Sequence, residues 1–374
     1  MRNKLVLVLA SVLLVFTACK KEFTITVTSD NEKWGSVTGG GTFAKGTEIK
    51  IKATPKASYK FTKWDDDNTD NPRTIVVKKD ASYTAIFEKK TSGGGDNPSG
   101  GDDPVQEGFS VSATTKVLFS PGNLQWSANN GGSTATTHIV AGGGTAAGTW
   151  RFAPNQWDTI GANNENISST YSGWIDLFGW GTSGYNSKYP YMTSTTNSDY
   201  GNGTNNISGT NYDWGVYNEI YNSKTQTTDA PGTWRTLTDD EWNYLINIRT
   251  TSSGIRYAKA KVNGVTGLIL VPDNWSTATY NLNSTNTSSA TYTTNVITST
   301  QWTSLENAGC VFLPAAGYRS GTSVNVVGSY GFYWSATCGD SYYAYYLYFY
   351  SGYVYTSSYY RCYGQSVRLV RSAE

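Results

Sequence analysis

Tyrosine is the residue type in this sequence whose number and spacing best suit a chemical role, and that role is non-covalent binding. Between Ser329 and Tyr363, 13 of 35 residues are tyrosine, nearly half of the 28 in the chain. A core does not require so many, because Phe and Leu pack without a partner for each hydroxyl group. Exposed tyrosine gives a large contact area at low conformational-entropy cost, as in antibody binding sites. We therefore expect a binding surface here.

The residues from 345 to 355 alternate, which predicts two strands joined by a turn at Ser351-Gly352. One face would carry the scaffold positions Tyr345, Leu347, Phe349 and Val354. The opposite face would carry Tyr346, Tyr348, Tyr350, Tyr353 and Tyr355. Tyrosines left in water as a contiguous patch invite association, so this outward face is predicted to contact a partner.

The tyrosine block could also arise in two ways that involve no ligand. The tyrosines could form a second core layer covered by the polar loops of residues 185–230, or they could be low-complexity drift. Drift would not keep Leu347, Phe349 and Val354 apolar at the positions where a core needs them.

The sequence gives little support for catalysis, so we expect no enzymatic activity, cofactor or metal. His138 is the single histidine, which excludes sites that need two imidazoles. Cys310 lies in an apolar run and is interpreted as a small buried side chain. Cys338 and Cys362 could form a disulfide or stay unpaired. The carboxylates of Asp239-Asp240-Glu241 are those of a helix N-terminus.

The charge balance argues against a nucleic-acid partner. The formal net charge is +1. Residues 20–90 carry 14 Lys and Arg against 10 Asp and Glu, and residues 107–374 carry 13 against 15. Neither part has the basic excess of a protein that binds phosphate backbones.

Residues 1–18 are predicted to be a lipoprotein signal peptide. Arg2 and Lys4 precede a 14-residue apolar run that is too short to span a bilayer. Phe16-Thr17-Ala18-Cys19 resembles a bacterial lipobox, with Phe16 where Leu is usual. The resemblance implies that Cys19 is acylated and that the protein contacts the membrane only through this lipid anchor. We expect the protein to be exposed at the surface of the outer membrane. The alternative is an ordinary signal peptide followed by a chance cysteine. The residues after Cys19 do not determine whether the protein stays in the inner membrane or is exported to the outer membrane.

Residues 19–90 are predicted to form a small all-β module, and residues 91–106 a flexible linker. Short alternating runs separated by Gly, Pro, Asn and Asp turns predict strands. Gly35-Ser36-Val37, Tyr59-Lys60-Phe61, Trp64 and Tyr83 to Phe87 resemble the divergent internalin B-type repeat of bacterial surface proteins, which implies a stalk. The linker is rich in Gly, Asp, Pro and Ser and has no aromatic residue to bury.

Residues 107–374 are predicted to form one α+β domain with long loops. Thr238 to Glu241 and Thr298 to Gln301 are capping boxes that each begin a helix, and Gly309 is a predicted stop for the second. The apolar runs at Leu268 to Pro272 and Cys310 to Pro314 predict buried strands. Loops of such length often carry function.

Several motifs of this domain resemble a family of secreted bacterial proteins with a C-type lectin-like fold. They are Phe119 to Gln125, Trp150 to Ala153, Gln156-Trp157, Trp174 to Gly184, Phe312 to Arg319, Tyr333 to Ser335 and Ser366 to Val370. That fold is shared with the formylglycine-generating enzymes and with the variable proteins of diversity-generating retroelements. The close copper-binding cysteine pair of the enzymes has no counterpart here, so the resemblance implies the fold rather than the activity.

The resemblance to the variable proteins implies that the tyrosine block is diversified. Such systems mutate adenines in asparagine codons, which cannot reach Lys, Glu, Gln, Met or Trp, and none of these occurs from Cys338 through Tyr363. The implied ligand-contact positions are Cys338, Asp340, Ser341, Tyr342, Tyr343, Tyr346, Tyr348, Tyr350, Tyr353, Tyr355, Tyr359, Tyr360, Arg361 and Tyr363.

Taken together, the sequence predicts a surface-anchored lipoprotein that binds a protein or glycan ligand through a diversified, tyrosine-rich face. The alternative is a structural or pilus-assembly lipoprotein whose tyrosine face packs permanently on a partner subunit.

Overall fold

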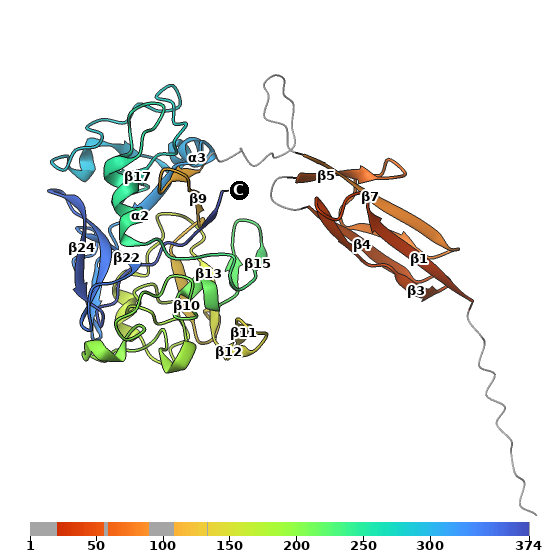
Figure 1. Ribbon diagram of the computed structural model, residues 1–374, viewed down its shortest axis with the longest axis horizontal. Helices are drawn as coiled ribbons and strands as arrows, with labels where there is room; N and C mark the ends of the chain where they lie inside the picture. Colours follow the sequence, from red (N-terminus) through yellow and green to blue (C-terminus); the bar gives the residue numbers. More distant parts are fainter. Residues whose placement is uncertain (1–20, 56–58, 90–107, 133, 374) are drawn as a thin grey trace, which may run out of the picture. The chain divides into compact units, whose positions relative to one another are not determined.

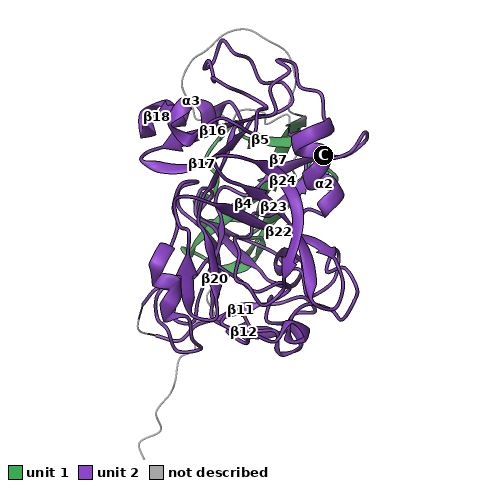
Figure 2. Cartoon of the chain, turned by 90° about the vertical axis from the view of Figure 1, so that its left-hand side faces the viewer, with its two compact units in different colours: residues 1–99, 374 green, residues 100–373 purple. Residues whose placement is uncertain are grey.

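The structure is a computed structural model that describes residues 21–55, 59–89, 108–132 and 134–373 (Figure 1). The predicted signal peptide 1–18, the lipidation residue Cys19 and the predicted linker 91–106 lie outside the described residues. The chain divides into two compact units, residues 1–99 with residue 374 and residues 100–373 (Figure 2). No helix of the described chain is long and apolar enough to cross a membrane.

Seven strands make up the described part of the first unit. They are β1 (Glu22–Ser29), β2 (Gly35–Thr38), β3 (Gly41–Ala44), β4 (Glu48–Pro55), β5 (Tyr59–Trp64), β6 (Arg73–Val76) and β7 (Ala81–Lys89). The strand order is β3-β1-β7-β5 in one sheet and β2-β4-β6 in another. Trp64 is fully buried with Ile51 and Phe87, as expected for the core of this module.

The second unit contains eighteen further strands and a few short helices within the described residues. The strands are β8 (Phe109–Ser110), β9 (Lys116–Phe119), β10 (Leu124–Ser127), β11 (Thr137–Ile139), β12 (Thr145–Ala147), β13 (Thr149–Phe152), β14 (Ile220–Asn222), β15 (Thr227–Asp229), β16 (Tyr257–Val262), β17 (Val265–Leu270), β18 (Val296–Ile297), β19 (Val311–Pro314), β20 (Tyr318–Ser320), β21 (Ser323–Asn325), β22 (Gly331–Cys338), β23 (Tyr343–Phe349), β24 (Val354–Tyr360) and β25 (Val370–Ser372). The helical segments are η1 (Gly161–Asn166), η2 (Tyr185–Ser187), η3 (Asn197–Asp199), α1 (Trp214–Tyr217), α2 (Asp239–Asn243), η4 (Tyr244–Ile248), η5 (Tyr292–Thr294) and α3 (Ser299–Asn307).

The predicted α+β fold class is wrong, because the chain is mostly small β-sheets and fits an all-β fold. About 38% of it is strand and 12% helix. The capping boxes of α2 and α3 form as predicted, on Thr238 with Glu241 and on Thr298 with Gln301. Several of the missed strands are only three residues long, as in β11-β12 and β20-β21, so they show no readable period of two. Each of these short strands pairs with its neighbour in the chain as a hairpin.

The sheet β22-β23-β24 lies between two hydrophobic clusters, and this placement decides which tyrosines reach water. On one face Leu347 and Phe349 pack in a cluster with Trp242 of α2, which lies against all three strands (Figure 1). On the other face Trp334 and Ala344 pack in a second cluster that is rich in tryptophan. Because side chains alternate along a strand, both faces of the central strand β23 are partly covered.

Candidate functional site

The register of β22, β23 and β24 brings tyrosines that are distant in sequence onto one face. Both strand pairs are antiparallel, and Tyr348 lies opposite Phe332 on one side and Tyr355 on the other. The predicted turn at Ser351-Gly352 joins β23 to β24, with hydrogen bonds between the backbones of Tyr350 and Tyr353 in both directions. The hairpin proposed from the sequence is therefore confirmed.

Four of these side chains line an open hollow at the turn end of the hairpin. The lining residues are Tyr348, Tyr350, Tyr353 and Tyr355, and the hollow holds about 330 Å³. We call it the tyrosine hollow. Tyr353 is 55% exposed and Tyr355 40% exposed, whereas Tyr348 is half-buried. Burial and the neighbouring Tyr330 raise the pKa of Tyr348, so this phenol stays neutral at physiological pH.

Two tyrosines that the sequence analysis did not assign support this surface from outside the hairpin. The ring of Tyr330 stacks on that of Tyr350 with centroids 5.0 Å apart. Tyr318, in β20, contacts Phe332 at 5.4 Å and stacks on Tyr363 at 5.2 Å. Tyr330 lies within the tyrosine-dense window and could have been found there. The position of Tyr318 depends on tertiary packing, for which the sequence carries no local signal.

A second group of predicted contact residues lies at the opposite end of the hairpin, where Tyr343 pairs with Tyr360 across the ladder. Their rings stack at 4.9 Å, and Tyr359 contacts both Tyr360 and Tyr363. Tyr342 is the most exposed of the predicted contact tyrosines, at 57%. The structure thus divides the predicted tyrosine surface into two groups rather than one continuous site.

Asp340 and Ser341 lie exposed in the turn that joins β22 to β23. One carboxylate oxygen of Asp340 accepts the backbone N–H groups of Tyr342 and Tyr343, at 2.7 and 2.9 Å. This is the arrangement in which an aspartate stabilises a turn. Asp340 therefore shapes the loop that presents Tyr342.

Two predicted contact residues are buried, which corrects the expectation that they face outward. Tyr346 is 6% exposed within the second cluster, its ring 6.1 Å from that of Trp334, and burial raises its pKa to about 12. Arg361 is 1% exposed, its guanidinium 4.6 Å from the ring of Trp180. The alternation of the strand predicted the face of Tyr346 correctly, but the second cluster covers that part of the face.

Arg361 instead holds the turn between β22 and β23 against a neighbouring loop. It donates hydrogen bonds to the carbonyl oxygens of Tyr343, Asp340 and Gly203, and its Nη2 lies 2.6 Å from the Sγ of Cys338. No carboxylate among the described residues forms an ion pair with it. Burial lowers the pKa of Arg361, and the nearby thiol opposes that shift.

The histidine and the cysteines that were considered as catalytic or metal-binding residues lie in structural environments. His138 is buried, with its ring nitrogens bonded to the carbonyl oxygen of Gly148 and to Oδ1 of Asn218. Cys310, Cys338 and Cys362 are free thiols, and Cys310 is buried as predicted. Over the described ranges, no group of three or more His, Cys, Asp or Glu residues could hold a metal ion.

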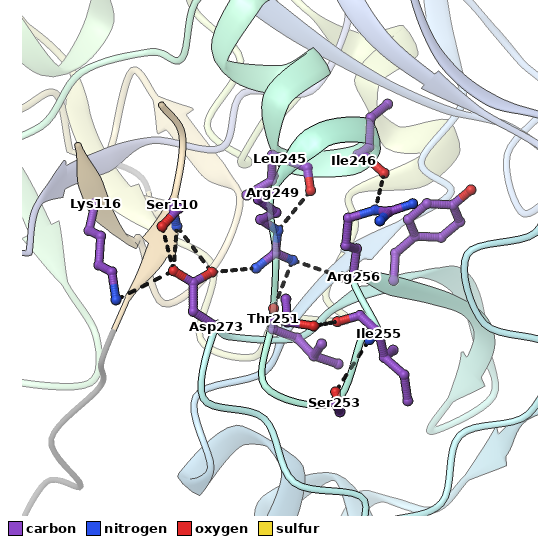
Figure 3. Close-up of polar contacts among 12 residues, drawn as sticks. Ser110, Lys116, Leu245, Ile246, Arg249, Thr251, Ser253, Ile255, Arg256 and Asp273 are labelled. Carbon is purple, nitrogen blue, oxygen red and sulfur yellow. Dashed lines mark hydrogen bonds and ion pairs between the residues drawn. The ribbon is translucent and has the colours of Figure 1, made fainter. Parts of the chain in front are cut away.

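The carboxylate of Asp273, in the second unit, also has a structural role (Figure 3). It accepts hydrogen bonds from the backbone and hydroxyl of Ser110 and from Nη1 of Arg249, and it pairs with Lys116 at 3.5 Å. Burial acts to raise the pKa of Asp273, but the hydrogen bonds from Ser110 and Arg249 outweigh it and lower that pKa. Both oxygens are occupied, so the group fastens β8 to the end of η4.

Comparisons with known proteins match two parts of the chain. Residues 25–91 match the divergent InlB B-repeat domain, which confirms the internalin B-type repeat expected for the first unit. Residues 283–370, which include the whole sheet β22-β23-β24, match a domain of unknown function (DUF8237). No curated protein and no solved structure matches the chain.

Proposed function

We propose that the second unit binds a protein or glycan ligand non-covalently through the tyrosines of β23, β24 and the turn between them. The observation that supports this most is the tyrosine hollow, an open depression lined by four tyrosines and no other residue. Ligand sites in proteins are concave and mostly apolar, with a few polar groups that set orientation. Here the rings provide the apolar area and the hydroxyl groups provide the polar contacts.

The scaffold under these tyrosines suits a binding site. Leu347 and Phe349 are fully buried on the face of β23 that packs on α2, so the strand that carries Tyr348 is fixed. A site that is held rigid before binding loses less conformational entropy when the ligand arrives. The surface tyrosines themselves have few rotatable bonds.

We further propose that the chain is a lipid-anchored protein of the bacterial cell envelope, held at Cys19 and displayed at the surface. The divergent InlB B-repeat module in residues 25–91 supports a stalk role for the first unit. Labelling growing cells with an alkyne-bearing fatty acid would test the anchor: wild type should be labelled and a Cys19→Ser variant should not. Protease shaving of intact cells would test surface display.

The block from Cys338 to Tyr363 is proposed to be diversified by a retroelement. Its support is the absence of Lys, Glu, Gln, Met and Trp over 26 residues that include all of β23 and β24. Sequencing the locus is the test. We expect a near-identical repeat of the codons for residues 335–370 beside a reverse transcriptase gene, differing only at adenines. Without such a repeat, the tyrosines would be a fixed surface with a single cognate partner.

Ligand binding is tested by screening the full chain against arrays of glycans and of cell-surface proteins. The double variant Tyr353→Ala/Tyr355→Ala should lose at least tenfold of the binding to any ligand found, since both rings border the hollow. The control is Tyr189→Ala, which removes a 43% exposed tyrosine outside the hairpin. Equal binding by the double variant and the wild type would contradict the proposal.

The structural alternative is favoured by one observation, the position of β24 at the outer edge of its sheet. Among the described residues, β24 pairs only with β23, and residues Val354–Tyr360 carry no charged side chain or proline that would discourage pairing with another strand. A permanent partner subunit would then be recovered with the protein from its own cells in fixed stoichiometry. A reversible ligand would wash away.

A further inference from the structure

The four rings of the tyrosine hollow form a closed circuit of contacts. Tyr348 contacts Tyr350 at 5.4 Å, Tyr350 contacts Tyr353 at 5.4 Å, Tyr353 contacts Tyr355 at 5.9 Å, and Tyr355 contacts Tyr348 at 5.1 Å, all between ring centroids. The planes of successive rings are inclined by 42° to 87°. The successive rings that line the hollow are therefore inclined to one another and do not form one flat platform.

The lining contains neither charge nor amide groups. The segments that build it, β23, the turn after it and β24, contain no Lys, Arg, Asp or Glu between residues 343 and 360. In the described part of the chain, no hydrogen bond is formed by the hydroxyl groups of the four tyrosines. A saccharide is normally oriented by several converging amide and carboxylate groups, and this hollow offers none of them.

Aromatic walls without charged neighbours suit a cation that forms no hydrogen bonds. The face of each phenol ring carries a negative quadrupole, which attracts a cation within about 6 Å of the ring centroid. A quaternary ammonium spreads its charge over its methyl groups, so it packs on such faces without needing an acceptor. Residues 343–360 contain no lysine or arginine that would repel such a cation.

We propose that the tyrosine hollow binds a trimethylammonium group such as that of choline. This rests on the proposed function, because it names the ligand chemistry of the same tyrosine surface. The hollow, at about 330 Å³, has the size of a small-molecule site and is open to solvent, so the rest of the ligand would extend outward. Tyr330, which stacks behind Tyr350, keeps one wall in place.

The test compares choline with its neutral isostere 3,3-dimethylbutan-1-ol, which has the same shape but no charge. Both are titrated into the full chain and followed by ligand-observed NMR. We expect choline to bind at least tenfold more tightly than the isostere, because the attraction of the rings depends on the charge. Equal binding of the two would overturn the proposal.

Variants at Tyr355 separate the ring from the hydroxyl group. Tyr355→Phe retains the ring and should bind choline within about twofold of wild type, whereas Tyr355→Leu retains apolar volume but should lose binding at least fivefold. Tyr189→Leu is the matched control and should bind as wild type. If Tyr355→Phe loses as much as Tyr355→Leu, the site recognises hydroxyl contacts, as for a saccharide, and the proposal fails.

Two further measurements identify the source of the trimethylammonium group and separate this proposal from the proposed function. Retention of the protein on phosphatidylcholine vesicles, but not on phosphatidylglycerol vesicles, would support a lipid headgroup as the ligand. Binding of free choline without binding to these vesicles would support a choline group carried by a molecule other than a membrane lipid. If choline does not bind, yet Tyr355→Leu still reduces binding to a ligand from the array screen, only the trimethylammonium proposal fails. If Tyr355→Leu changes neither choline binding nor binding to the ligand from the array screen, both proposals fail.

Discussion

Tyr348 lies directly opposite Tyr355 across the β23-β24 ladder, and their rings meet nearly at right angles with centroids 5.1 Å apart. Such cross-strand aromatic pairs stabilise antiparallel sheets by about 0.2–1 kcal/mol. The pair therefore has two roles, since the same contact that steadies the hairpin also forms one side of the tyrosine hollow. Fixed backbone pairing, rather than a flexible loop, positions this part of the candidate site.

The exposed tyrosines should be dispensable for folding, whereas the residues beneath them should not. Tyr353→Ala, at a position 55% exposed, should change the free energy of unfolding by about 0.5 kcal/mol or less. Leu347→Ala, at a fully buried position, should reduce it by about 2–5 kcal/mol. Urea unfolding of both variants tests this. A large loss of stability in Tyr353→Ala would mean that the tyrosine is a core residue.

Arg361 should prove to be a structural residue rather than a ligand contact. Arg361→Ala removes the hydrogen bonds that this buried side chain donates to three carbonyl oxygens, together with its contact with the ring of Trp180, so we expect a loss of about 3 kcal/mol in the free energy of unfolding. Arg371→Ala is the control, at a position that is exposed to solvent, and should change stability by about 0.5 kcal/mol or less. If Arg361→Ala were as stable as wild type and lost only ligand binding, the contact role predicted from the sequence would be restored.

Stability should fall as the pH rises from 4 to 6. Burial raises the pKa of Asp176 and of Asp213 from 3.8 to about 6, although each carboxylate accepts hydrogen bonds that oppose the shift. Between those values the folded state holds more protons than the unfolded state, so each group lowers the free energy of unfolding by up to about 1.4 kcal/mol per pH unit. Urea unfolding at several pH values measures the slope.

A variant provides the control for this pH dependence. Asp213→Asn retains the shape of the side chain and one of the two oxygens that accept hydrogen bonds from the backbone N–H and hydroxyl of Thr236. The asparagine does not titrate. The slope between pH 4 and 6 should therefore be smaller than in wild type. A slope that is unchanged, or a wild-type stability that rises with pH over this window, would contradict the assignment.

The three described thiols should react with iodoacetamide in a fixed order. Cys338 is half-buried, and although burial raises its pKa, the guanidinium of Arg361 opposes the shift. Cys310 is buried, and burial raises its pKa well above the usual value. Mass spectrometry of the native protein should show Cys338 labelled first and Cys310 last, with all three labelled after denaturation. A Cys338–Cys362 disulfide in the isolated protein would contradict the free thiols of the structure.

Local sequence signals were sufficient for several elements. The two capping boxes predicted where α2 and α3 begin, because a Thr followed three residues later by Glu or Gln satisfies backbone groups within one turn. The alternation of Leu347 and Phe349 with tyrosine predicted strand β23, and Ser351-Gly352 predicted its turn. The first unit was identified from the spacing of its turns and aromatic residues, and its match to the divergent InlB B-repeat domain confirms it.

The sequence by itself determined the hairpin, the two helix starts, the repeat module and the density of tyrosine from which a binding surface was predicted. Only the tertiary structure decided that the fold is all-β, that Tyr346 and Arg361 are buried, and that Tyr330 and Tyr318 join the surface. The physical reason is the range of the interactions. Capping and alternation act over a few residues, whereas burial depends on which distant segment packs on each face of the sheet.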